Sequence, residues 1–292
     1  HEGSDPGLTP LAVNVPLRLT GRGEMAEQRA NGPGDYILPS TDDETRRLER
    51  QALLYGGLDF LEPFVCHEPR QILDVGCGSG HFTRQVAARI PGATVTGLEI
   101  DAARLSFARA HCGAANLRFV QGDLTAMELD DDAFDLVFCR FVLVHQRDPL
   151  TALREMARVT RPGGRVVAYD MIHEGIWFSP PKPALQTLLA TTIAVLRERG
   201  AEPNQGLHLP VGMKRAGLQQ VQARVIPHFA LSSEPLFERY RENWLATVAS
   251  LAQTCGDRFD ERLVQTAELE LQPTAEDQFL VEVTVLAHGT KG

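Results

Sequence analysis

Residues 71–80, Gln-Ile-Leu-Asp-Val-Gly-Cys-Gly-Ser-Gly, decide the fold of this chain. The run from Ile72 to Val75 predicts a buried β-strand, and three glycines then alternate with other residues. Glycine lets the backbone turn sharply and lets a ligand approach without a Cβ in the way. A helix is expected from about Phe82 to Ile90, and its N-terminus offers free N–H groups and a positive dipole end to an anionic group.

The next predicted strand, residues 93–99, ends in an acid, Glu99. A carboxylate at a strand tip can accept hydrogen bonds from both hydroxyls of a ribose. Strand, glycine turn and acid together predict a nucleoside site at the carboxyl edge of a parallel sheet. Dinucleotide enzymes space their glycines as G-x-G-x-x-G, whereas this chain has G-x-G-x-G. The glycines alone leave a nicotinamide dehydrogenase and a second nucleoside cofactor class open.

Three later segments carry a family resemblance. Residues 119–124 read Phe-Val-Gln-Gly-Asp-Leu, residues 134–141 read Phe-Asp-Leu-Val-Phe-Cys-Arg-Phe, and residues 153–169 contain the turn Arg-Pro-Gly-Gly. With the G-x-G-x-G turn, they resemble the third strand, fourth strand and following helix-turn-strand of class I S-adenosylmethionine-dependent methyltransferases, in the right order. The resemblance covers roughly residues 70–170 and disfavours a dehydrogenase.

The resemblance implies S-adenosyl-L-methionine as the cofactor. It implies that Asp123 takes the adenine amino group and that Leu124 helps to frame the ring. Arg140 is expected beside the amino-acid part of the cofactor or the substrate, with a structural ion pair as the alternative. The residues predicted to bind the cofactor are Tyr36, Gln51, Gly76, Cys77, Gly78, Gly80, Glu99, Ile100, Gly122, Asp123, Leu124 and Arg140.

Strand and helix patterns alternate through the core, which indicates a doubly wound α/β sheet. The predicted fold is a Rossmann-like, seven-stranded, mostly parallel sheet with an antiparallel last strand and helical cap insertions. Strands are expected near residues 71–75, 94–99, 117–121, 134–140, 164–169, 218–230 and 279–287. The expected organisation is a mobile or tag-derived tail (1–34), an N-terminal helical lid (35–64) and a methyltransferase domain (65–292) with caps at 171–200 and 232–272.

The predicted lid begins at Tyr36, and within it a helix capped by Ser40 or Thr41 is expected to run through Gln51 to about Leu61, where Pro63 ends it. Its pattern Y-x-L-P…E-x-x-R-L-x-x-Q resembles a subgroup of methyltransferases from microbial secondary metabolism, which includes fungal regulators and bacterial enzymes acting on indole alkaloids. In that subgroup the segment covers the bound cofactor. Ordinary packing and a solvated helix face are the alternative interpretation.

The amino-acid composition of the chain limits the kinds of partner that it is expected to bind. The net charge is −9 without a basic cluster, so nucleic acid is not an expected partner. No apolar run approaches the roughly 18 residues of a membrane span. The five cysteines are scattered without a C-x-x-C pair, which favours a reducing, cytoplasmic compartment and argues against a structural zinc site. A small-molecule acceptor is expected, and the oligomeric state stays open.

Methyl transfer from a sulfonium is an in-line displacement that needs alignment and, for some acceptors, removal of a proton. The candidates for handling that proton are Tyr36, His145, His173 and Glu174. Bracing of its loop is the alternative role for His145. No metal is predicted, because metal-dependent relatives carry acids after the fourth strand, where this chain has Cys139-Arg140-Phe141.

The sequence thus predicts a methyltransferase acting on a small aromatic or apolar natural product, with an indole ring carbon as one target. Trp177 or Phe178 is expected to contact that acceptor, and Tyr240 and Trp244 to close its pocket. The alternatives are an O- or N-methyltransferase of another small metabolite and a non-catalytic regulator that binds the cofactor.

Overall fold

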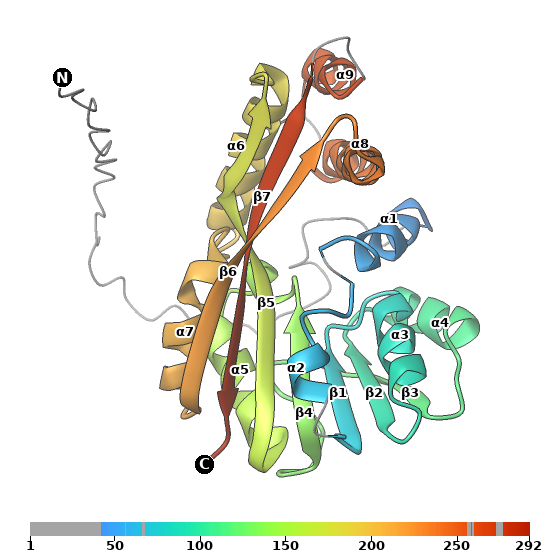
Figure 1. Cartoon of the computed structure of the whole chain (residues 1–292), viewed down its shortest axis with the longest axis vertical. Coiled ribbons are helices and arrows are strands. Elements are labelled where there is room, and N and C mark those ends of the chain that lie inside the picture. Colours follow the sequence, from blue (N-terminus) through green and yellow to red (C-terminus); the bar gives the residue numbers. More distant parts are fainter. Residues whose placement is uncertain (1–41, 56, 66–67, 256–257, 259, 273–276) are drawn as a thin grey trace, which may run out of the picture. The chain divides into compact units, whose positions relative to one another are not determined.

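A computed structural model describes residues 42–292, except residues 56, 66–67, 256–257, 259 and 273–276. The described part is built on a seven-stranded sheet in the order β3-β2-β1-β4-β5-β7-β6 (Figure 1). Only β7 runs antiparallel to its neighbours, so the predicted fold class is confirmed. The strands are β1 (Gln71–Val75), β2 (Thr94–Glu99), β3 (Leu117–Gln121), β4 (Phe134–Arg140), β5 (Thr160–Ser179), β6 (Gln219–Leu231) and β7 (Phe279–Thr290).

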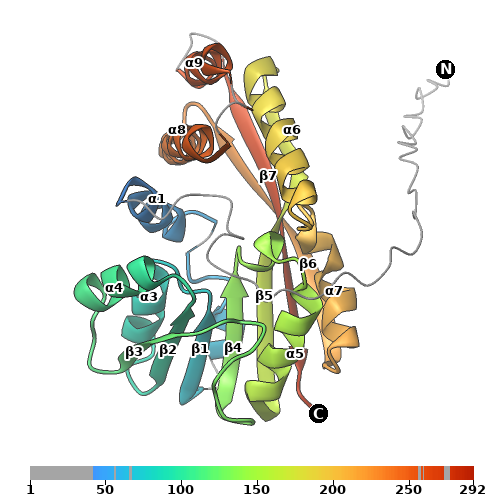
Figure 2. The same cartoon turned by 180° about the vertical axis from the view of Figure 1, so that it is seen from behind.

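Helices cover both faces of the sheet, as Figure 1 and the reverse view in Figure 2 show. None of the described helices is long and apolar enough to cross a membrane. The helices are α1 (Asp42–Ala52), α2 (Glu62–Val65), α3 (His81–Arg89), α4 (Ala102–His111), the 3₁₀ turn η2 (Leu143–His145), α5 (Pro149–Val159), α6 (Pro183–Glu198), α7 (Gln205–Arg215), α8 (Pro235–Cys255) and α9 (Glu261–Glu270).

The alternation of side chains along each strand creates two hydrophobic cores. Ile72 packs in the core that contains α3 residues such as Phe82 and Val86. Its neighbour Leu73 faces the opposite core, which contains Leu153 of α5. Strands buried on both faces are near-continuous apolar runs, which is why these segments were recognisable in the sequence.

The fifth strand is longer than predicted. It was expected to end at Tyr169, but β5 continues to Ser179 and pairs with β7 as far as Phe279. The pairing shifts register between Ile172 and Trp177, and a bulge of this kind interrupts the alternation that marks a strand in sequence. Residues 171–179 therefore extend the sheet and are not part of a separate helical insertion.

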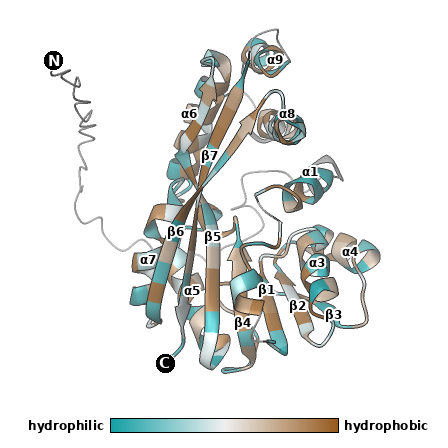
Figure 3. Ribbon diagram, viewed as in Figure 1, coloured by the Kyte–Doolittle hydropathy of each residue, from teal (hydrophilic) through white to brown (hydrophobic). Residues whose placement is uncertain are grey.

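The N-terminal helix also differs from its prediction. α1 ends at Ala52, and Tyr55 takes a positive φ of 57° just beyond it. Pro63 then lies in the first turn of α2, where proline is tolerated because its missing N–H has no partner there. Figure 3 shows α1 as mostly hydrophilic, yet its position between α3 and α8 buries part of its charge.

Candidate functional site

A large cavity opens at the carboxyl ends of β1, β2 and β4. Its walls come from the turns after these strands, from α1, α6 and α8, and from the middle of β7. Most of the described residues that were predicted to bind the cofactor line this cavity: Gln51, Gly76, Cys77, Gly78, Glu99, Ile100, Gly122, Asp123, Leu124 and Arg140. Gly80 does not line it, and Tyr36 lies outside the described residues.

The glycines of the first turn serve two purposes. A Cβ on Gly76 would lie 2.6 Å from Val142, and one on Gly80 would lie 2.7 Å from Phe119, so packing requires glycine at both positions. Gly78 has φ of +56°, and a Cβ there would meet only Leu48 of α1, at 3.4 Å. Gly78 is therefore the glycine whose missing side chain leaves room on the cavity side, under α1.

Glu99 closes the glycine turn. One carboxylate oxygen accepts the N–H of Gly78 at 2.9 Å, and the other accepts the N–H of Asp101 at 2.9 Å. Each oxygen retains a second lone pair, and the side chain borders the cavity while only 6% exposed. The carboxylate is thus oriented by the backbone and can still receive the hydroxyls of a ribose.

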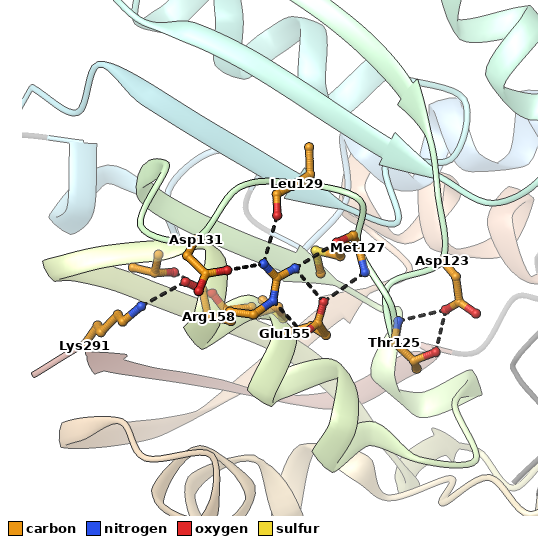
Figure 4. Close-up of polar contacts among 10 residues, drawn as sticks. Asp123, Thr125, Met127, Leu129, Asp131, Glu155, Arg158 and Lys291 are labelled. Atoms are coloured by element: carbon orange, nitrogen blue, oxygen red, sulfur yellow. Dashed lines mark hydrogen bonds and ion pairs between the residues drawn. The ribbon is translucent and has the colours of Figure 1, made fainter.

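Asp123 lies on the loop between β3 and β4, and one of its carboxylate oxygens accepts both the N–H and the hydroxyl of Thr125. Figure 4 shows how Arg158 of α5 anchors the rest of this loop. Its guanidinium donates to the carbonyl oxygens of Met127 at 2.8 Å and Leu129 at 2.9 Å, and it pairs with Glu155 at 2.8 Å. This network holds the loop that presents Asp123.

Asp74 and Arg140 form the polar floor of the cavity. Burial raises the pKa of Asp74 to about 7, although the Thr83 hydroxyl donates to it at 2.7 Å and Arg140 lies nearby. Burial lowers the pKa of Arg140 to about 10, and its guanidinium carbon lies 4.1 Å from the centre of the Phe82 ring. Its buried Nη1 has no hydrogen-bond partner in the described chain, so one donor is available to a carboxylate ligand.

α1 covers one side of the cavity with a buried ion pair. Arg47 lines the cavity and pairs with Glu44 at 2.7 Å, and Ser250 of α8 donates to the same carboxylate at 3.1 Å. Glu49 of α1 also lies 3.4 Å from His81 of α3. These contacts attach the described part of the predicted lid to elements on either side of it.

The candidates for proton transfer differ in whether they line the cavity. His145 and His173 line the cavity, whereas Glu174 is exposed and pairs with Arg197 at 2.6 Å. Burial lowers the pKa of His145 to about 3, which makes its imidazole a weak base. The Nδ1–H of His173 donates to the Pro203 carbonyl at 2.6 Å, which leaves Nε2 as an acceptor.

The remaining cavity wall is mostly apolar. α6 contributes Leu189, Thr192 and Leu196, α8 contributes Asn243, Trp244, Thr247 and Leu251, and β5 contributes Met171 and Ile176. Neither aromatic residue expected from β5 lines the cavity. Trp177 is 54% exposed because it points to the opposite face from Ile176, and Phe178 packs edge to face behind Trp244. Tyr240 packs against Tyr55.

Sequence reasoning missed Tyr55 and Glu282, which both line the cavity. Burial raises the pKa of Glu282 to about 7 and that of the Tyr55 hydroxyl well above its ordinary value. One signal was present in the sequence. Glu282 falls on the same face of its alternating strand as Leu280 and Leu286, where an apolar residue is the usual choice.

Comparison with known proteins shows which family and which solved structures the chain resembles. Residues 73–168 match the family model described as "Methyltransferase domain". The structure of a Haemonchus contortus phosphoethanolamine N-methyltransferase in complex with S-adenosyl-L-methionine has a TM-score of 0.56 with 18% identity, and the match covers 87% of this chain and 58% of that one. Residues 73–168 therefore resemble a methyltransferase domain, and the described chain shares its fold with that methyltransferase structure.

Two proteins of known name are similar to part of the chain in sequence. The chain is 34% identical over 167 residues to a ubiquinone biosynthesis O-methyltransferase of Alkalilimnicola ehrlichii, which covers 56% of this chain and 63% of the relative. It is 38% identical over 107 residues to an O-methyltransferase of Penicillium expansum, which covers 35% and 38% respectively. The chain thus spans less than two thirds of the length of these relatives.

Proposed function

We propose that the chain is an S-adenosylmethionine-dependent methyltransferase that acts on a small aromatic or largely apolar acceptor. One observation supports the proposal: a single cavity joins the sheet edge where we expect the nucleoside to an apolar chamber. The first part carries Gly78, Glu99 and Asp123, and the second is walled by α6 and α8. Methyl transfer needs donor and acceptor in one enclosed space, and this cavity offers it.

The chain's own residues fit the cofactor. In our proposal, Glu99 holds the ribose, Asp123 and Leu124 frame the adenine, and Arg140 uses its free Nη1–H to bind the carboxylate of the amino-acid part. The bound cofactor supplies an activated methyl group on a sulfonium. The segment 35–64 acts as a lid over it, and residues 232–272 act as a cap over the acceptor.

Two acceptor classes are proposed for this chamber. An indole ring carbon follows from the resemblance of the N-terminal segment to enzymes of indole metabolism, and it would place the chain in natural-product biosynthesis. Transfer to oxygen is favoured by the names of the two relatives described above, which are O-methyltransferases. The free thiols of Cys77, Cys112 and Cys139 suit a reducing, cytoplasmic compartment.

Two measurements test the proposal. Calorimetry should detect binding of S-adenosylmethionine and of S-adenosylhomocysteine but not of NAD. Incubation with cofactor labelled in its methyl group, and with indole and phenol acceptors, should yield labelled product. Cofactor binding without transfer to any acceptor would favour a non-catalytic regulator, and failure to bind the cofactor would refute the proposal.

A further inference from the structure

Only one of the two oxygens of the buried Glu282 carboxyl group has a close hydrogen-bond donor in the described chain. Its Oε1 accepts the indole N–H of Trp244 at 2.8 Å, while its buried Oε2 has no hydrogen-bond partner in the described chain. No lysine or arginine in that part forms an ion pair with it, and the residue is 1% exposed. The Tyr55 hydroxyl is the other donor that acts on this carboxyl group, but it makes no bond short enough to satisfy Oε2. Burying a carboxyl oxygen without a close donor is costly, so Oε2 can accept a further donor from a ligand.

The neighbouring polar groups already satisfy one another. His228, across from Glu282 on β6, contacts the Tyr169 hydroxyl at 2.9 Å, and Thr284 donates to the same hydroxyl at 2.9 Å. These imidazole and hydroxyl groups bond to one another, and none of them bonds to Glu282.

A second unsatisfied acceptor lies on the same cavity. Oδ1 of Asn243, on α8, is buried and has no partner among the described residues. Asn243 and Glu282 both line the cavity, as do the apolar Leu251 and Ile176, and Asn243 directly precedes Trp244, which bonds to Glu282. This end of the cavity therefore presents hydrogen-bond acceptors in an apolar setting, which suits a neutral ligand that carries a donor.

We propose that Glu282 receives the N–H or O–H hydrogen of an aromatic acceptor and that Asn243 provides a second hydrogen-bond acceptor beside it. This inference rests on the proposed function and specifies its substrate class: an aromatic ring with a donor, not an acyl carboxylate or a phosphate. In the transfer step the acceptor's electron pair forms the bond to the methyl carbon and the carbon–sulfur bond breaks. Its electrons stay on sulfur, and the acceptor proton passes to Glu282.

Paired probes test the donor requirement directly. Indole and benzofuran differ in one N–H, and 2-naphthol and naphthalene differ in one O–H. Calorimetry is done on the full chain at about pH 8, with and without S-adenosylhomocysteine, because the Glu282 carboxyl group has a pKa of about 7 and is mostly ionised there. The donor-bearing member of at least one pair should bind about tenfold tighter, as expected for a hydrogen bond to a charged group. The indole and naphthol pairs distinguish nitrogen from oxygen donors.

The variant Glu282→Gln gives the sharpest contrast. Its amide oxygen must keep the bond from Trp244, so its NH₂ group replaces the acceptor with a donor. The tenfold preference should then fall to less than about threefold, whereas Glu242→Gln, an exposed control on α8, should retain it.

Three results would overturn the proposal: no preference within either pair in the natural chain, an unchanged preference in Glu282→Gln, or no binding of any probe. The titration with S-adenosylhomocysteine tests the proposed function independently of Glu282. If S-adenosylhomocysteine fails to bind but the donor preference persists, the proposed function fails and the assignment of Glu282 stands.

Discussion

The indole N–H of Trp244 donates a 2.8 Å hydrogen bond to Glu282, which links α8 to β7 across 38 positions of sequence. The same two side chains line the apolar part of the cavity. The bond therefore connects α8 to the sheet at the point where we propose that an acceptor binds, and it leaves the other carboxyl oxygen without a close partner in the described chain.

Removing this bond should destabilise the fold. Trp244→Phe keeps an aromatic ring against Phe178 but removes the indole N–H that donates to Glu282. We expect a loss of about 1–3 kcal/mol in the free energy of unfolding, measured by urea denaturation. Trp177→Phe, at an exposed position, should change it by less than about 0.5 kcal/mol. Equal effects of the two changes would show that the bond to Glu282 contributes nothing.

Glu282 should also give stability a defined pH dependence. Burial raises its pKa to about 7, so the folded chain keeps a proton that the unfolded chain releases from about pH 4.5. The stability contributed by this group therefore falls as pH rises from about 4.5 to 7 and is constant above that. Asp74 and Asp170, whose pKa values burial also raises to about 7, titrate in the same direction.

The variant Glu282→Gln isolates this contribution, because Asp74 and Asp170 remain in both proteins and cancel. The stability of the variant relative to the natural chain should increase between pH 4.5 and 7, by on the order of 2–3 kcal/mol. Urea titrations at several pH values measure the difference. A difference that stays flat, or that shrinks as pH rises, would contradict the assigned direction.

Glu99 should control cofactor affinity. Glu99→Gln keeps the shape of the side chain but removes the charge that orients Gly78 and Asp101 and would receive the ribose. Loss of a charge-assisted contact corresponds to roughly tenfold weaker binding or more. Calorimetry with S-adenosylhomocysteine measures this, with the exposed Glu128→Gln as the control. Unchanged affinity in Glu99→Gln would refute the ribose assignment.

Arg158 should also affect the affinity for S-adenosylhomocysteine, although its side chain does not line the cavity. Arg158→Lys keeps the charge but loses the planar fork that contacts Met127, Leu129 and Glu155 together. The loop that carries Asp123 should loosen, and S-adenosylhomocysteine should bind about three- to tenfold more weakly, the equivalent of one hydrogen bond. The exposed Arg154→Lys on the same helix is the matched control and should bind normally. Similar affinity in both variants would mean that the network does not position Asp123.

The ion pair in α1 offers a test of the lid. Arg47→Met removes one charged partner of the buried Glu44 carboxylate, and breaking a buried ion pair typically costs about 3–5 kcal/mol. Hydrogen exchange of the α1 amides should accelerate in this variant and recover in the double variant with Glu44→Gln. Arg50→Met, at an exposed position of the same helix, should exchange at the natural rate. No acceleration in Arg47→Met would show that the pair does not hold α1.

The sequence by itself determined the sheet and its cofactor edge. Apolar runs such as Ile72–Val75, the alternating glycines and the acid at Glu99 are local patterns, and the structure has β1, β2 and the turn where they were expected. Local patterns suffice because a strand buried on both faces, or a turn with positive φ, restricts the residue types at adjacent positions.

Only the tertiary structure decided the composition of the cavity. β5 runs on to Ser179 because β7 pairs with it over residues 279–283, and that pairing turns Ile176 inward and leaves Trp177 exposed. Trp244 and Glu282 meet because α8 packs beside the same strands. These contacts join segments far apart in the chain, so neighbouring residues carry almost no signal of them, and the acceptor end of the site followed from packing alone.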